Sequence, residues 1–254
     1  NHLHGGVKKS FDKVVWKVDQ VENVSDSASK RCGIRLSYVS PDGEEGYPGT
    51  VKTQVHFFLD GANHLTIHYL ATTDKATPIN LTNHAYFNLA GAGAETVLDH
   101  ELRLHANDYV PVDDTLIPIG KRAPVPGTVF DFTKMTRIGE RIAKLYDTSA
   151  KGYDHCYALT RRDKTPTVAA ILRDPQSGRV LTVSTTQPGI QLYTGNFLFG
   201  QKGAGGKEYK QRSGVCLETC HFPDAVNQLE LGPTVIVQPG AEYRHTTVFA
   251  FAAE

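Results

Sequence analysis

The stretch VKTQVHFFLDGANHLTIHY, residues 51–69, decides the fold class of this chain. In residues 51–59 one face carries Val, Thr, Val, Phe and Leu at every second position, the period of a strand with a buried face. Residues 60–63, Asp-Gly-Ala-Asn, are turn formers, and the alternation resumes over residues 65–69. Two alternating runs joined by a short turn predict an antiparallel β-hairpin.

Similar signals recur along the rest of the chain. Residues 168–186 contain two apolar runs around the turn Asp-Pro-Gln-Ser-Gly, which predicts a second hairpin. The run Val-Cys-Leu-Glu-Thr-Cys at 215–220 predicts a strand that carries a carboxylate near its end. The turn Gln238-Pro239-Gly240 predicts a last hairpin, which closes with a strand over residues 243–251.

Helical periodicity is confined to one place. Ile138, Ile142 and Leu145 are spaced i, i+4, i+7 and predict one short amphipathic helix. Many short strands with turns about every ten residues, and a single short helix, predict an all-β protein. We therefore expect a large antiparallel β-sandwich.

Size and charge limit the classes of function. The chain has 254 residues, and its 27 Lys and Arg balance its 27 Asp and Glu. We expect one domain over residues 1–254 and a monomer. Nucleic acids and anionic membranes require a basic surface, so neither is expected as a partner. We find no apolar run of the ~20 residues that span a bilayer, and no secretory leader opens the chain.

The cysteines point to a reducing compartment. Cys32, Cys156, Cys216 and Cys220 form neither a dense disulfide framework nor CxxC pairs. We expect reduced thiols in a cytoplasmic protein. Cys216 and Cys220 have no second pair that would complete a zinc site, and the histidines that precede Gly5 have no Cys or carboxylate beside them. No metal site is predicted.

A polar, aromatic segment stands out against this background. Residues 80–89, Asn-Leu-Thr-Asn-His-Ala-Tyr-Phe-Asn-Leu, combine three asparagines, a histidine and two aromatic rings without strict alternation. Amides and imidazoles bind hydroxyl groups, and aromatic rings pack on C–H faces, as a site for a hydroxylated ligand requires. The alternative is a strand end whose single histidine, His84, is a satisfied structural residue.

Other polar residues at strand ends are candidates to share a site with His84, namely His4, Asp154, His155, Gln191 and Glu218. A Glu and a His side by side form an acid–base pair, because imidazole titrates near ~6.5 and Glu near about 4.3. The residues alone leave open that these are separate, satisfied side chains. They also leave open a glycosidase with Asp154 and Glu218 as its two carboxylates. The chain has no G-x-S-x-G serine elbow and no H-E-x-x-H zinc motif.

Several long motifs in order resemble the galactose mutarotase (aldose 1-epimerase) family. The resemblance extends from the first residue to the last, which makes it far more specific than any single motif. The matching segments are NLTNHAYFNL at 80–89, LHGG at 3–6, DGEEGYPG at 42–49, GYDH at 152–155, TQPGIQ at 186–191, YTGNF at 193–197, LET at 217–219 and PDAVNQ at 223–228.

The resemblance implies a role for individual residues. Glu218 matches the general base that takes the proton of the anomeric hydroxyl, and His84 matches the general acid that protonates the ring oxygen. Ring opening, rotation about C1–C2 and closure then exchange the anomers of free galactose or glucose. No cofactor is implied. The residues implied in sugar binding are His4, Ala85, Tyr86, Asp154 and Gln191.

The resemblance also implies roughly eighty further residues before the LHGG motif. That segment would carry early strands and an Arg that contacts the sugar. We therefore expect the chain shown to be poorly soluble or inactive alone, and a longer parent to be active. Polarimetry with α-D-galactose on both proteins tests this expectation.

Two other functions stay open at this point. One is a non-catalytic sugar-binding sandwich, against which the presence of both Glu218 and His84 argues. The other is an epimerase of hexose phosphates, which would need basic residues near the phosphate. No Arg/Lys cluster lies on the motif segments.

Overall fold

The computed structural model describes residues 2–25, 30–160 and 164–254. These residues form two compact units. The first comprises Asn1–Leu81 and Thr234–Thr247, and the second comprises Thr82–Pro233 and Val248–Glu254. The single domain over residues 1–254 stays an expectation.

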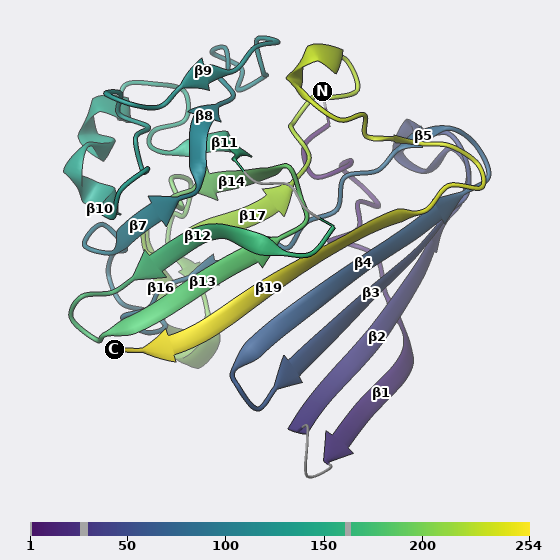
Figure 1. The fold of residues 1–254 in the computed structure, drawn as a ribbon, viewed down its shortest axis with the longest axis horizontal. Helices are drawn as coiled ribbons and strands as arrows, with labels where there is room; N and C mark the ends of the chain where they lie inside the picture. The colour runs from purple at the N-terminus through teal and green to yellow at the C-terminus, as the bar shows by residue number, and fades with distance from the viewer. Residues whose placement is uncertain (1, 26–29, 161–163) are drawn as a thin grey trace. The chain divides into compact units, whose positions relative to one another are not determined.

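The first unit is an antiparallel sheet in the order β1-β2-β3-β4 (Figure 1). Its strands are β1 (Lys17–Ser25), β2 (Lys30–Ser40), β3 (Val51–Asp60) and β4 (His64–Thr73). The predicted hairpin at 51–69 is confirmed by the β3–β4 pairing, which places Val55 opposite Tyr69. The Asp60 carboxylate fixes the turn, because its Oδ1 accepts hydrogen bonds from the backbone N–H groups of Ala62 and His64.

The first unit also corrects one prediction. The turn at residues 238–240 is present, but β18 (Ile236–Val237) pairs with β5 (Thr77–Pro78). The sequence predicted that the strand before this turn pairs with the strand after it. The short strand β18 pairs with β5 instead, so this prediction is wrong. Strand β19 (Tyr243–Ala253) follows β18, with its first residues in the first unit and its last residues in the second.

The second unit contains a six-stranded antiparallel sheet in the order β6-β17-β14-β11-β8-β9 and a group in the order β13-β12-β7-β10. The predicted hairpin at 168–186 is confirmed as β12–β13. Two strands of the six-stranded sheet, β14 and β17, are buried almost throughout, which explains why their sequences are nearly continuous apolar runs. The strands are β6 (Tyr86–Phe87), β7 (Glu101–Leu104), β8 (Ala106–Tyr109), β9 (Ala123–Pro124), β10 (Thr136–Arg137), β11 (Asp154–Leu159), β12 (Thr167–Arg173), β13 (Arg179–Thr185), β14 (Gly189–Tyr193), β15 (Gln201–Lys202), β16 (Glu208–Tyr209) and β17 (Val215–Cys220).

The predicted helix at 138–145 differs in kind from the structure. It consists of two 3-10 turns, η2 (Ile138–Glu140) and η3 (Ile142–Leu145), which Arg141 separates with φ −128° and ψ −3°. Ile138, Ile142 and Leu145 are nevertheless buried, so the apolar spacing correctly identified the face that packs inward. The other 3-10 turns of the described residues are η1 (Glu44–Gly46), η4 (Ala204–Gly206) and η5 (Leu229–Leu231).

The all-β antiparallel architecture predicted from the sequence is confirmed. In the described part of the chain, no helix has the length and hydrophobicity that a bilayer-spanning helix needs.

Candidate active site

Three neighbouring strands of the second unit build the site. Strands β11, β14 and β17 are adjacent, and their register places Gln191 opposite Glu218 and Tyr193 opposite both Asp154 and Cys216. Side chains two residues apart on a strand point to the same face, and directly opposite side chains are neighbours. The register therefore gathers these five side chains on one face of the sheet.

His84 reaches this face from a segment without regular structure. The segment ends where β6 begins, and there Tyr86 pairs with Cys216 of β17. Asn83 Oδ1 accepts a 3.2 Å hydrogen bond from the N–H of Ala85, which closes a turn around His84.

Asn88 fastens the other end of the segment. Its Nδ2 donates hydrogen bonds to the carbonyl oxygens of Ser213 and Ala94, and its Oδ1 accepts one from the N–H of Ala90. Asn83 and Asn88 thus hold the backbone on either side of the imidazole and its aromatic neighbour.

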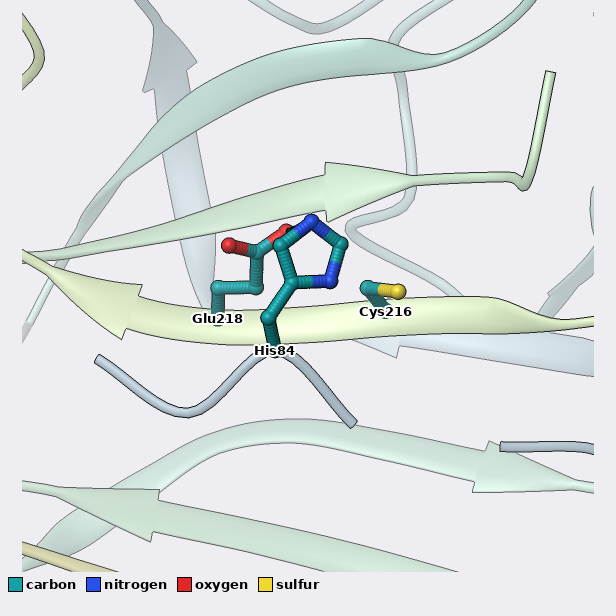
Figure 2. A group of neighbouring side chains, drawn as sticks. All are labelled: His84, Cys216 and Glu218. Atoms are coloured by element: carbon teal, nitrogen blue, oxygen red, sulfur yellow. Dashed lines mark ion pairs between the residues drawn. The ribbon is translucent and has the colours of Figure 1, made fainter. Parts of the chain in front are cut away.

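The central pair of the site is His84 and Glu218. Their Nε2 and Oε1 atoms lie 3.6 Å apart. Figure 2 shows the imidazole reaching from its own segment over the strand that carries the Glu218 carboxylate. The His84 side chain is 31% exposed and that of Glu218 is 11% exposed, so a ligand can reach the imidazole while the carboxylate is largely shielded from water.

Two tyrosines frame the imidazole. The ring of Tyr86 is stacked on that of His84 at 5.1 Å between centroids, and Tyr193 meets it edge-on at 6.0 Å. Burial raises the pKa of both phenols, so both stay neutral hydroxyl groups at physiological pH. The rings limit the orientations that His84 can adopt.

Burial raises the pKa of Glu218 to about 8, and the negative charge of Asp154 adds to this effect. A buried carboxylate loses hydration, which makes its ionised form a stronger base than an exposed Glu. The site therefore contains a carboxyl group tuned to exchange protons near neutral pH.

Asp154 and Gln191 lie beside Glu218 on the same face of the sheet, on strands β11 and β14. Gln191 Nε2 donates a 2.7 Å hydrogen bond to Asp154 Oδ1. Two hydrogen bonds fix the backbone just before β11. The carbonyl of Tyr153 accepts a hydrogen bond from Asn196 Nδ2, and the N–H of Tyr153 donates one to Thr194 Oγ1. A side chain at Gly152 would collide with Asn196, which explains the Gly in front of this carboxylate.

Comparison with known proteins assigns this chain to a family. The family model for aldose 1-epimerase matches residues 1–250. The chain belongs to the aldose 1-epimerase family. Human galactose mutarotase is 48% identical over 253 residues, an alignment that covers 99% of this chain and 69% of the human protein. The aldose 1-epimerase of Escherichia coli K12 is 37% identical over 256 residues, covering 100% of this chain and 71% of that protein.

Solved structures agree as well. The crystal structure of an aldose epimerase homologue from C. elegans superposes with a TM-score of 0.82 at 30% identity, covering 99% of this chain and 72% of that one. A galactose 1-epimerase from Lactobacillus acidophilus NCFM gives the same TM-score and identity, with 99% and 70% covered.

His4, which the family resemblance implies in sugar binding, belongs to the first unit. It has a positive φ of 55° and is followed by Gly5 and Gly6. The Glu45 carboxylate accepts hydrogen bonds from the N–H groups of residues 7–9, and a side chain at Gly6 would collide with it. The family motif around Glu45 therefore fixes the turn that follows His4. Contact between His4 and a sugar stays a prediction.

His155 has a different environment from Asp154, its neighbour in the sequence. It is buried, its ring lies 4.5 Å from that of Phe130, and it accepts a hydrogen bond from the N–H of Asp154 at Nδ1. Burial lowers the pKa of His155 to about 4, so the ring is neutral at physiological pH. It lies on the opposite face of β11 and packs in the core.

Two residues of the site were not singled out from the sequence. Cys216 and Tyr193 lie on the same face as Glu218 and Gln191 because each pair is two residues apart on one strand. Strand periodicity could have identified both once Glu218 and Gln191 were taken as candidate site residues. The expectation of no metal site also overlooked the grouping of Cys216 with His84 and Glu218.

Proposed function

We propose that this protein is an aldose 1-epimerase that interconverts the α and β anomers of free aldohexoses such as galactose or glucose. Membership of the family supports the reaction, and the 3.6 Å pair of His84 Nε2 and Glu218 Oε1 supports the assignment of the two proton-transfer groups. Glu218 acts as general base and His84 as general acid.

The reaction requires two proton transfers in each direction. Glu218 takes the proton of the anomeric hydroxyl while protonated His84 gives a proton to the ring oxygen. The C1–O5 bond breaks as the carbonyl forms at C1, which gives the open-chain aldehyde. Rotation about C1–C2 exposes the other carbonyl face to O5. Closure reverses both transfers and restores Glu218 and His84 to their initial protonation states.

The surroundings of Glu218 suit this role. Because burial raises its pKa to about 8, its ionised form is a stronger base towards a weakly acidic sugar hydroxyl than an exposed Glu would be. When His84 carries a proton, its opposite charge favours the ionised form of Glu218. A single proton shared by the pair is thus sufficient for the reactive state.

Binding follows from the remaining walls of the site. The Asp154 carboxylate and the Gln191 amide supply acceptors and donors for sugar hydroxyls, and their mutual hydrogen bond orients both. Tyr86, with an exposed ring, can pack on the C–H face of a hexose, and Ala85 lies beside it. His4 completes the proposed binding set.

The Glu218→Gln variant of the full-length protein tests the proposal. The amide is nearly isosteric but cannot accept the hydroxyl proton, so we expect the anomerisation rate to fall ~10²–10⁴-fold. Polarimetry of freshly dissolved α-D-galactose measures the rate after subtraction of the uncatalysed reaction. Calorimetric titration with galactose should show binding within a few fold of the unsubstituted protein. Retained activity would contradict the role of Glu218, and an unsubstituted protein that binds galactose without turnover would identify a sugar-binding protein.

A further inference from the structure

The catalytic pair has a third neighbour that the reaction does not use. His84, Cys216 and Glu218 each offer one ligand atom, and these nitrogen, sulfur and oxygen atoms all lie within 4.8 Å of one another. Figure 2 shows Cys216 and Glu218 on the same strand with the His84 ring close to both. Cys216 and Glu218 are buried, and His84 is the most exposed of the three.

The positions of all three residues are fixed by the sheet. Cys216 and Glu218 share one face of β17 because they are two residues apart. Cys216 pairs with Tyr86, which is two residues after His84 in the chain and stacks on its ring. The same strand pairing that positions the acid and the base therefore brings the thiol to them.

A nitrogen, a thiolate and a carboxylate are the ligand types that Zn²⁺ prefers. Tetrahedral zinc has ligand distances of about 2.0–2.3 Å, which puts ligand atoms roughly 3.3–3.8 Å apart. The His84 Nε2 and Glu218 Oε1 atoms are already at this spacing, 3.6 Å apart, and all three ligand atoms lie within 4.8 Å of one another. Three protein ligands with a fourth open position describe a zinc site that a water molecule completes.

We propose that His84, Cys216 and Glu218 form a binding site for a thiophilic divalent cation such as Zn²⁺, and that the bound cation inhibits the enzyme reversibly. The inhibition rests on the proposed epimerase function, whereas the binding does not. The cation occupies the imidazole lone pair and the carboxylate, so neither group can exchange a proton with the sugar. The Cys216 thiol releases its proton to water, and no electron transfer is involved.

The cation and the sugar exclude each other. The space beside His84 and Glu218 is where C1, O1 and O5 of the sugar must lie for proton transfer. Hard cations such as Mg²⁺ prefer oxygen ligands and do not select a site with a thiolate. Zn²⁺ should therefore bind where Mg²⁺ does not, and galactose should weaken Zn²⁺ binding.

Calorimetric titration of the full-length protein with ZnCl₂ in the absence of sugar tests the binding itself. We expect one cation per chain and at least about a tenfold loss of affinity in Cys216→Ala, since removing even a partner that only supports a metal ligand costs about that much. Cys32→Ala, which removes an exposed thiol of β2, and Cys220→Ala, on the same face of β17, are matched controls that should bind as the unsubstituted protein does. Circular dichroism spectra establish that each variant is folded.

The second measurement sets Zn²⁺ against galactose in the unsubstituted protein and in Cys216→Ala. Galactose in excess should lower the apparent Zn²⁺ affinity, and Zn²⁺ should lower the anomerisation rate until EDTA restores it. Inhibition of Cys216→Ala is scored against its own uninhibited rate. Zn²⁺ affinity that is equal in Cys216→Ala and Cys220→Ala, or that galactose does not change, overturns the proposal. An unsubstituted protein without epimerase activity in the absence of Zn²⁺ would contradict the proposed function. The calorimetric measurements would still decide whether the cation binds.

Discussion

Glu218 and Asp154 interact through their charges although a strand lies between them. They stand on β17 and β11, and β14 separates the two strands. Burial is the larger cause of the raised pKa of Glu218, and the Asp154 charge adds to it. Gln191 on β14 donates its hydrogen bond to Asp154, so one row of side chains links the proposed sugar-binding residues to the proposed base.

The first prediction concerns Asp154→Asn. Removing this charge removes one of the two causes that raise the pKa of Glu218, so the base ionises at a lower pH. The acidic limb of the kcat profile should move to lower pH, while weaker hydroxyl binding raises KM for galactose. Polarimetric rates between about pH 5 and pH 9 measure both effects. Asp147→Asn removes an exposed carboxylate of the same unit and serves as control. An acidic limb that stays in place would contradict the electrostatic link.

The second prediction concerns the stability cost of the buried base. The folded-state pKa of Glu218 is about 8 against an ordinary value of 4.5, so the folded state binds more protons than the unfolded state between these values. The free energy of unfolding therefore falls as pH rises through this window. Glu218→Gln has no titrating carboxyl group at this position, so its free energy of unfolding does not fall for this reason. Its stability relative to the unsubstituted protein should increase by a few kcal/mol from pH 4.5 to pH 8.

Urea unfolding followed by circular dichroism at several pH values measures this difference. Glu95→Gln, which replaces an exposed carboxyl group of the same unit, should show no such trend. A pH-independent difference between Glu218→Gln and the unsubstituted protein would show that Glu218 has an ordinary pKa in the folded state.

Local periodicity was enough to predict the hairpins at 51–69 and 168–186, because one buried face leaves a signal with a period of two residues. The hairpin at 51–69 is the clearest case, since its turn residues and both alternating runs lie in one segment. Residues 236–237 show the limit, because their partner strand at 77–78 is remote in the sequence. Short-range patterns identify a turn but do not specify a distant partner.

The site illustrates the same limit. Spacing alone left open whether His84 and Glu218 share a site. The family motifs joined them before the structure placed them 3.6 Å apart. Cys216 and Tyr193 were missed because the two-residue period of a strand points to them only after Glu218 and Gln191 have been assigned to the site. His155 is the converse case, since it neighbours Asp154 in sequence yet lies in the core.

The third prediction concerns Asn83, whose Oδ1 accepts a hydrogen bond from the N–H of Ala85, the residue after His84. Asn83→Ala removes this acceptor and frees the backbone that orients the acid. We expect kcat to fall about tenfold or more while galactose affinity changes little, because misplacing a catalytic group affects turnover first. Asn83→Ser keeps a short oxygen acceptor and should restore part of the rate. Equal losses of turnover and affinity would indicate a general disturbance of the site.

The fourth prediction concerns His155, whose pKa is lowered by burial to about 4. The folded state resists protonation of this ring, whereas the unfolded chain protonates it near the ordinary value of 6.5. The contribution of His155 to the free energy of unfolding is therefore fully present above pH 6.5 and is lost as pH falls towards 4. This pH dependence is opposite in direction to that of Glu218. His155→Leu should lack this acid-dependent loss in urea unfolding experiments.

The catalytic readout separates His155 from His84. His155→Leu leaves every proposed proton-transfer group in place, so the acidic limb of its kcat profile should coincide with that of the unsubstituted protein. His84→Ala removes the proposed acid and should lower kcat ~10²–10⁴-fold. A comparable loss of turnover in His155→Leu at full stability would place this core histidine in the reaction, against its burial beside Phe130.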